Sequence, residues 1–204
     1  MTTQLRRAPS GPNRRARIAV DMDEVIADSL TQHLAAYNRA FGAQLHAADL
    51  AGRHLEEAVP PAEAEVVRAF EREPGFFANL AVIAGSQEVL AALAESYELF
   101  IATAAMEVPT SFAEKFAWLR RHFPFIPPSH VVFCGDKGVL DVDYLIDDTP
   151  RHFRHFRGQP ILFSAPHNRH ERGFFRVDGW AAVRRVFLAG GVGAAPVLSR
   201  PGLD

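Results

Sequence analysis

Two aspartates separated by one residue, Asp21 and Asp23, are the first feature of this chain that could carry chemistry. The apolar run 18–20 leads directly into them, and a second apolar pair, Val25-Ile26, follows. Carboxylates crowded together beside an apolar core are costly unless a cation or a proton compensates their charge. The stretch therefore indicates a site that is built to hold a compensating partner.

Further polar residues follow the other apolar runs of the chain. Thr103 ends the second run, Asp136 and Lys137 follow the third, and Asp147 and Asp148 follow the fourth. In an open α/β sheet, ligands bind outside the carboxyl ends of the strands. If the strands are parallel, we expect all these side chains to converge on one edge of the sheet, together with the first two aspartates.

Each polar position also has a purely structural interpretation. Asp148 or Thr149, for example, could cap a helix that opens at Pro150. For any one position taken alone, a helix-capping role is favoured. Helix capping does not explain why acidic residues recur at so many strand ends. Crowding of Asp21, Asp23, Asp147 and Asp148 would require a cation, and Mg²⁺, which prefers carboxylate, water and phosphate oxygens, is the natural one.

Short β-rich runs alternate with helical patterns along the chain and predict an α/β fold. Such alternation is typical of right-handed βαβ units in a mostly parallel, Rossmann-like sheet with helices on both faces. The predicted strands are 17–22, 99–103, 131–134, 144–146 and 160–163, and the predicted helices are 86–96, 109–122, 149–156 and 179–188.

Residues 28–84 break this rhythm and predict a small helical cap inserted after the first strand. They contain two helical patterns, 30–41 and 62–73, and no convincing strand. The core domain would then comprise 17–27 and 85–188. Residues 1–16, which are rich in arginine, and the Gly- and Pro-rich tail 189–204 are predicted to be flexible extensions.

Composition narrows the class of protein. The 204 residues carry a formal net charge of −2, which provides no overall attraction to nucleic acid or to a membrane surface. No apolar run approaches the roughly 20 residues that span a bilayer, and no secretory signal is recognisable. The single cysteine, Cys134, fits a reducing compartment, so we expect a cytoplasmic protein.

The ordered set of motifs resembles the haloacid dehalogenase phosphohydrolases. The segments DMDEV, Thr103, a lysine and IDD match the four motifs of that superfamily in order. The finer resemblance is to its 5′(3′)-deoxyribonucleotidase branch, carried by VDMDEVIAD, PGFFANL, EKFAWL, CGDKGVLDVDYLIDD and APHNRH. It spans about Arg17 to Leu188 and implies a Mg²⁺-dependent phosphomonoesterase acting on nucleoside monophosphates.

The resemblance also implies residue roles. Asp21 would take the phosphoryl group as an aspartyl phosphate, and Asp23 would act as general acid and then as general base. Mg²⁺ would be bound by Asp21, by the backbone carbonyl of Asp23 and by the pair Asp147 and Asp148, with Asp148 the favoured direct ligand of that pair.

Thr103 and backbone N–H groups near Ala104 would bind the phosphate oxygens, and a lysine would offset the charge of the transferring group. Two lysines are candidates. Lys137 fits the pattern of the branch and is favoured, whereas Lys115 fits the placement in the wider superfamily or is a solvated helix residue.

The cap would close over the substrate and exclude water. Phe76 or Phe77 could stack on a base, or could plug the space between cap and core. The late motif 167–170 is predicted to be a polar loop that orders the edge of the site, in preference to a metal site formed by its two histidines.

Three positions depart from the animal nucleotidases: Glu24 replaces a glycine, Ala104 a hydroxyl residue and Gly135 an arginine. These changes leave the base and sugar preference open, and a homodimer is left open as well. The alternatives are a phosphatase for another small phosphomonoester and a non-catalytic phosphate-binding module. A signalling receiver domain would place its acids on other strands, and no P-loop is present in the sequence.

Overall fold

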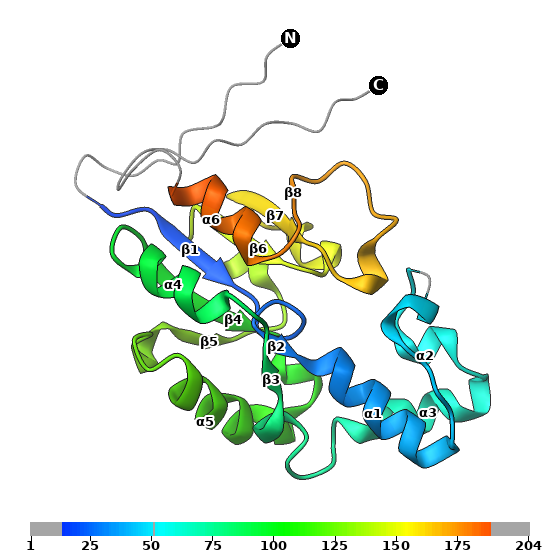
Figure 1. The fold of residues 1–204 in the computed structure, drawn as a ribbon. Helices are drawn as coiled ribbons and strands as arrows, with labels where there is room; N and C mark the ends of the chain where they lie inside the picture. The colour runs from blue at the N-terminus through cyan, green and yellow to red at the C-terminus, as the bar shows by residue number, and fades with distance from the viewer. Residues whose placement is uncertain (1–13, 51, 189–204) are drawn as a thin grey trace.

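A six-stranded parallel sheet forms the centre of the protein, for which a computed structural model describes residues 14–50 and 52–188. The strand order is β5-β4-β1-β6-β7-β8 (Figure 1). Every neighbouring pair in this sheet is parallel. The strands are β1 (Arg17–Val20), β4 (Glu98–Thr103), β5 (Val131–Phe133), β6 (Tyr144–Asp147), β7 (Gln159–Phe163) and β8 (Arg176–Val177). The α/β fold expected from the sequence is confirmed.

Ile18, Ala19 and Val20 of strand β1 are fully buried because both faces of the sheet are covered. Ile18 and Val20 belong to the cluster that includes residues of the helices α4 (Ser86–Ala94), α5 (Phe112–His122) and α6 (Trp180–Leu188). Ala19 points to the other face, where it packs in a smaller cluster with Leu145 and Phe153. The uninterrupted apolar run of β1 is the pattern expected for a strand covered on both sides.

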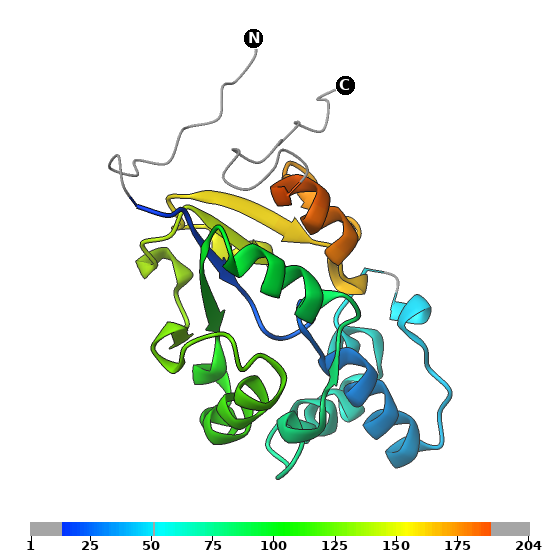
Figure 2. The ribbon, with the colours of Figure 1, turned by 60° about the vertical axis from the view of Figure 1, so that its left-hand side comes forward.

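The segment between β1 and α4 contains a group of helices that lies apart from the sheet (Figures 1 and 2). These helices are α1 (Ser29–Phe41), α2 (Leu55–Ala58) and α3 (Pro61–Phe70). A two-residue antiparallel pair, β2 (Ala27–Asp28) with β3 (Ala81–Val82), joins the chain where it enters and leaves this group. Asp28 caps α1 by accepting a hydrogen bond from the backbone N–H of Thr31 at 2.9 Å. We call residues 28–84 the cap, and their boundary as a domain remains a prediction.

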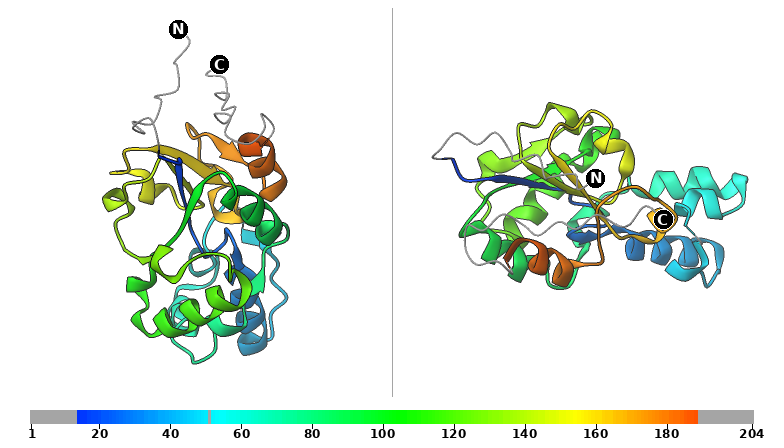
Figure 3. Two further views of the ribbon diagram at one scale, coloured as in Figure 1. Left: turned by 90° about the vertical axis from the view of Figure 1, so that its left-hand side faces the viewer. Right: turned by 90° about the horizontal axis from the view of Figure 1, so that it is seen from above.

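The cap lies beyond the carboxyl ends of the strands, as the view from above shows (Figure 3). Val20 is in register with Ile101 of β4 and Ile146 of β6. The residues that follow Val20 and Ile146 therefore emerge at the same level and face the cap. This register is what can bring the aspartates of the first and fourth motifs together.

Several predicted elements differ from the observed ones. Strand β1 ends at Val20, because the chain turns at the aspartates. The predicted helix 149–156 is a single 3₁₀ turn, Pro150–Phe153, and buries Phe153 against the sheet. The strands β2, β3 and β8 were not predicted, since a strand of two residues carries no recognisable alternation.

Two further expectations concern the ends of the chain and membranes. The predicted extensions at 1–16 and 189–204 lie almost wholly outside the described residues. Within the described ranges 14–50 and 52–188, no helix is both long and apolar enough to cross a bilayer.

Candidate active site

Three aspartates meet where β1 and β6 end. Asp21, Asp147 and Asp148 are all buried, and one carboxylate oxygen from each lies within 4.8 Å of the others. The backbone N–H of Asp21 donates to the carbonyl of Ile146 at 2.9 Å, so the ladder between the strands continues as far as the first aspartate. Convergence of the first and fourth motifs follows directly from the parallel register.

Lys137 lies between two of these acids and is fully buried. Its Nζ donates to Asp21 and, at 2.5 Å, to Asp147 Oδ2. Burial raises the pKa of Asp21 to about 6, although Lys137 opposes the shift. Burial also raises the pKa of Asp147, but the charges of Lys137 and His152 outweigh it and hold that pKa below its usual value. One cation among three acids leaves the site short of positive charge.

The shortage of positive charge affects Asp148 most strongly. Burial, followed by the charges of Asp147 and Asp21, raises the pKa of Asp148 well above its usual value. Carboxylate oxygens in this arrangement are the ligands that a hard divalent cation prefers. The donor set therefore fits Mg²⁺, which would relieve the repulsion among the three acids.

Lys115 occupies the other side of the site. Its Nζ donates to Asp23 Oδ2 at 2.5 Å and to Thr103 Oγ1 at 3.2 Å. The remaining carboxylate oxygen of Asp23, Oδ1, is buried and has no hydrogen-bond partner among the described residues. Asp23, Thr103 and Lys115 thus form a second polar group beside the three aspartates.

A cavity of about 640 Å³ opens between this group and the cap. Its volume is in the range of small-molecule sites. Core residues that line it include Asp21, Asp23, Ala104, Lys115, Asp148 and His152, and cap residues that line it include Leu30, His33, Leu50, Val67, Glu71 and Phe77. Lys137 is not among the lining residues, so of the two candidate lysines Lys115 is the one that faces the cavity.

The two phenylalanines of the PGFFANL segment have different positions. Phe77 lines the cavity, and its ring lies 4.5 Å from Nζ of Lys115. Phe76 lies behind it and packs on His33, with ring centroids 4.6 Å apart. Stacking of a base on Phe77 stays a prediction, and the ring face that Lys115 covers is not available for it.

Glu24 connects the catalytic loop to the cap. Its backbone has a φ of 56°, a left-handed conformation that favours glycine. Its half-buried carboxylate accepts hydrogen bonds from Leu30 N at 2.6 Å and Ser29 Oγ at 2.8 Å, at the start of α1. Burial raises the pKa of Glu24 to about 7. Glutamate at this position, where the animal nucleotidases have glycine, therefore links the loop to the first cap helix by hydrogen bonds.

Asn168 of the late motif holds the loop that carries Asp148. Its Nδ2 donates to the carbonyls of Asp148 at 2.7 Å and Phe163 at 2.8 Å. Its Oδ1 accepts from Arg176 at 2.7 Å. A polar loop at the edge of the site was expected here, but the individual roles of Asn168 and Arg176 were not, because these contacts join distant parts of the chain.

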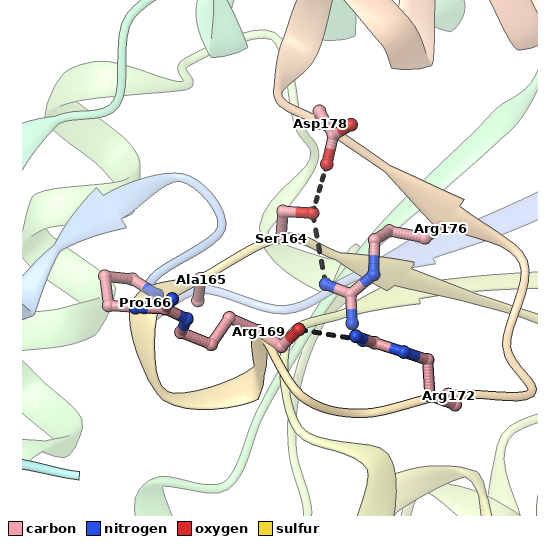
Figure 4. A pocket seen from close by; sticks show the side chains of 7 residues that line it. All are labelled: Ser164, Ala165, Pro166, Arg169, Arg172, Arg176 and Asp178. Atoms are coloured by element: carbon pink, nitrogen blue, oxygen red, sulfur yellow. Dashed lines mark hydrogen bonds between the residues drawn. The ribbon is translucent and has the colours of Figure 1, made fainter. Parts of the chain in front are cut away.

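A second hollow of about 460 Å³ lies on the outer side of this loop (Figure 4). Three arginines line it: Arg169, Arg172 and Arg176. The Arg176 guanidinium donates to Ser164 Oγ and to three oxygens of Asn168 and Glu171. Arg172 donates to two backbone carbonyls. The donors of Arg176 hold the chain around Asn168, which gives this arginine a structural role, whereas the contacts of Arg172 are exposed.

The histidines near the site do not join the aspartates as a cluster of possible metal ligands in the described part of the chain. His167 Nε2 lies 3.2 Å from the carbonyl oxygen of Asp148, and its ring stacks on His54 of the cap at 4.2 Å. Burial, with His54 nearby, lowers the pKa of His167 to about 4. His152, which sequence reasoning missed, contacts Asp147 through Nδ1 at 2.9 Å.

Asp136 does not join the site, contrary to the expectation from the strand ends. It is exposed and caps the turn at Gly138 with a hydrogen bond of 2.8 Å. Gly135 is surrounded by open space, since nothing lies within 4 Å of a Cβ built there. No side chain from another element therefore lies directly beside Gly135, where the animal nucleotidases have an arginine.

Comparison of the sequence with known proteins identifies the family of this chain. The sequence model of the family described as 5′ nucleotidase, deoxy (pyrimidine), cytosolic type C protein matches residues 14–191. The chain belongs to this family. A relative from Bacillus subtilis named 5′(3′)-deoxyribonucleotidase is 39% identical over 171 residues, which cover 84% of this chain and 98% of the relative. A relative from Staphylococcus epidermidis is 46% identical over 173 residues, covering 85% and 96% of the two chains.

Solved structures support the fold at greater distance. A haloacid dehalogenase-like hydrolase from Streptococcus pneumoniae aligns with a TM-score of 0.53 at 12% identity, over 80% of this chain and 94% of the other. CbbY from Rhodobacter sphaeroides, solved with xylulose-(1,5)-bisphosphate, aligns with a TM-score of 0.51 at 18% identity, over 89% and 100%. The resemblance stated from the motifs is confirmed, and the protein is a hydrolase of the phosphatase class.

Proposed function

We propose that this nucleotidase-family protein hydrolyses (deoxy)nucleoside monophosphates to nucleoside and phosphate, with Mg²⁺ and through an aspartyl phosphate on Asp21. The observation that carries the proposal is the convergence of Asp21, Asp23 and Lys115 on one cavity beside a three-aspartate cluster, with the buried Thr103 in contact with Lys115. The names of the relatives supply the substrate class. The lone Cys134 is compatible with the cytoplasm, where we place the reaction.

Asp21, Asp147 and Asp148 would hold the Mg²⁺ ion. When bound, the ion supplies positive charge that neutralises the phosphate and orients it toward the nucleophile. Lys137 contributes to the same balance from within the core, since it contacts Asp21 and Asp147. Its role in this proposal is to keep both acids ionised and in place.

The first step transfers the phosphoryl group. A carboxylate oxygen of Asp21 forms a bond to phosphorus while the bond from phosphorus to the ester oxygen breaks. Asp23 gives a proton to that leaving oxygen, and its unpartnered Oδ1 is the atom available for it. Nucleoside leaves with a free hydroxyl group.

The second step returns the enzyme to its starting state. Asp23, now ionised, removes a proton from water, and the water oxygen attacks the phosphorus of the aspartyl phosphate. The bond between phosphorus and the Asp21 oxygen breaks, and inorganic phosphate leaves. In this proposal Lys115 Nζ donates to the phosphoryl oxygens in both steps. Thr103 was expected to bind phosphate as well, but it is fully buried and does not line the cavity, so it acts by holding Lys115 through the hydrogen bond that its Oγ1 accepts. In this proposal Lys115 takes the role of the lysine that contacts phosphate.

Phosphate release from a panel of substrates tests the proposal. The panel contains deoxynucleoside and ribonucleoside monophosphates, sugar phosphates and p-nitrophenyl phosphate, each with Mg²⁺ and with EDTA. We expect Mg²⁺-dependent release that is fastest from the nucleotides. Release from sugar phosphates alone would preserve the chemistry and reject the substrate class, and no release from any compound would reject the proposed activity.

A further inference from the structure

A contact between a histidine and a glutamate of the cap borders the proposed substrate cavity. Nε2 of His33, on α1, lies 3.3 Å from Oε1 of Glu71, which follows α3. Both residues line the cavity, and the Glu71 side chain is 36% exposed whereas that of His33 is 15% exposed. The pair therefore presents mainly the carboxylate to whatever fills the cavity.

The contacts of His33 fix the orientation of its ring. Nδ1 lies 3.1 Å from the carbonyl oxygen of Ser29 and Nε2 lies 3.3 Å from Oε1 of Glu71. Both ring nitrogens therefore face a partner within the protein. The second carboxylate oxygen of Glu71, Oε2, can accept a hydrogen bond from another donor.

A continuous row of side chains connects this pair to the phosphate end of the cavity. Lys115 Nζ lies 4.5 Å from the ring of Phe77, whose centroid is 5.0 Å from that of Phe76. The ring of Phe76 lies 4.6 Å from that of His33, which contacts Glu71. Glu71 is thus a few side chains from the lysine that we assign to phosphate.

The segment that carries this row is fixed to the core. Backbone N–H groups of Gly75 and Phe77 donate to the carboxylate of Glu114, on α5, at 2.6 and 3.1 Å. Although burial opposes the shift, His33 and then Lys115 lower the pKa of Glu71, which agrees with a carboxylate close to the phosphate end. Apolar cap residues such as Leu30 and Val67 line other parts of the cavity and suit a base.

We propose that Glu71, positioned by His33, is a specificity-determining residue that accepts a hydrogen bond from the free sugar hydroxyl of the substrate. The inference rests on the proposed nucleotidase function. A nucleoside 5′-monophosphate offers its 3′-hydroxyl, and a 3′-monophosphate offers its 5′-hydroxyl. A second phosphate in that position would meet the carboxylate as a like charge, so Glu71 selects monophosphates over bisphosphates.

The test compares a 2′-deoxynucleoside 5′-monophosphate with the 2′,3′-dideoxy compound of the same base. A hydrogen bond to a charged group corresponds to roughly 10- to 100-fold in kcat/KM, and we expect the wild type to favour the deoxy compound by about that factor. In Glu71→Leu the ratio should fall close to one because hydrolysis of the deoxy compound slows. Glu65→Leu is the control, since Glu65 lies on α3 with an 80% exposed side chain and pairs with Arg68.

A second variant covers the case in which Glu71→Leu does not fold. Glu71→Gln preserves the shape and one acceptor without the charge, and its ratio should fall to a value of about 2 to 10. Equal turnover of both compounds by the wild type, or an unchanged ratio in both variants, would overturn the role of Glu71. Wild type that hydrolyses p-nitrophenyl phosphate but neither nucleotide would instead reject the proposed function.

Discussion

Replacing Lys137 with methionine removes the positive charge that lies between Asp21 and Asp147. The lysine is fully buried, and the side chains of its two partners are 7% and 0% exposed, so water cannot compensate for the loss. Removal of one partner of a buried ion pair costs about 3–5 kcal/mol. For a chain of this size, that corresponds to a decrease in Tm of about 6–20 °C.

The loss of stability should depend on pH and on metal. Without Lys137 the pKa values of Asp21 and Asp147 rise in the folded state. The folded state then binds more protons than the unfolded state, and its stability falls as pH increases. We expect a larger loss at pH 8 than at pH 5 in EDTA, and partial recovery when Mg²⁺ is added at pH 8.

Urea unfolding of Lys137→Met at the two pH values, with EDTA or Mg²⁺, measures these effects. Lys115→Met is the matched control: this lysine is also buried, but its partner Asp23 has a 30% exposed side chain and can be partly hydrated. Its loss should be about 1–2 kcal/mol. The double variant Lys137→Met with Asp147→Asn should recover part of the stability. A loss below about 1 kcal/mol for Lys137→Met, or one that is equal at both pH values, would refute the reasoning.

Three further predictions concern other residues of the site. Lys115→Met should reduce kcat/KM by about 100-fold or more, because a donor to the transferring phosphoryl group is lost; a change below tenfold in phosphate-release assays would reassign the phosphate lysine. Asn168→Ala should lower the free energy of unfolding by about 2–4 kcal/mol, because the buried side-chain amide of Asn168 forms hydrogen bonds with Asp148, Phe163 and Arg176. The control is Arg172→Ala at an exposed position, which should change the free energy of unfolding by about 0.5 kcal/mol at most. Asp21→Asn should be inactive yet more stable than wild type in EDTA above pH 6, by up to about 3 kcal/mol at 1.36 kcal/mol per pKa unit. A pKa raised from 3.8 to about 6 makes the ionised form destabilising as pH rises through that window. The gain in thermal unfolding should therefore shrink toward pH 4, and a gain that is the same at every pH would contradict it.

The convergence of residues at the site was predictable because parallel strands align their ends. The apolar runs before Asp21, Thr103 and Asp147 were sufficient to indicate three neighbouring strands, and the sheet brings these residues together. Asp136 shows the limit of that argument. It also follows a strand, but the chain turns outward after β5 and leaves its carboxylate exposed.

The positions of the two lysines could not be derived from the sequence. Lys137 follows a strand end and was favoured for phosphate, but the turn at 137–139 directs it inward to Asp21 and Asp147. Lys115 looks like an ordinary helix residue in the sequence. It reaches Asp23 because α5 packs against the 75–77 segment, and that packing depends on contacts between distant parts of the chain.

The same limitation applies to residues that act through tertiary contacts. Glu24 could be recognised as a departure from glycine, but not as the acceptor at the start of α1. His33 lies on α1 and Glu71 directly follows α3, and the two residues carry no sequence signal as a pair. Their contact arises only when α1 and α3 pack against each other.

Detection of the phosphorylated enzyme is the most direct test of the account. The protein would be mixed with a deoxynucleoside 5′-monophosphate and Mg²⁺, quenched in acid within the first turnover and digested for peptide mass spectrometry. We predict a phosphoryl group on Asp21 that is released by hydroxylamine and is absent from Asp21→Asn. Turnover with the phosphoryl group on another residue, or an active Asp21→Asn variant, would contradict the central claim.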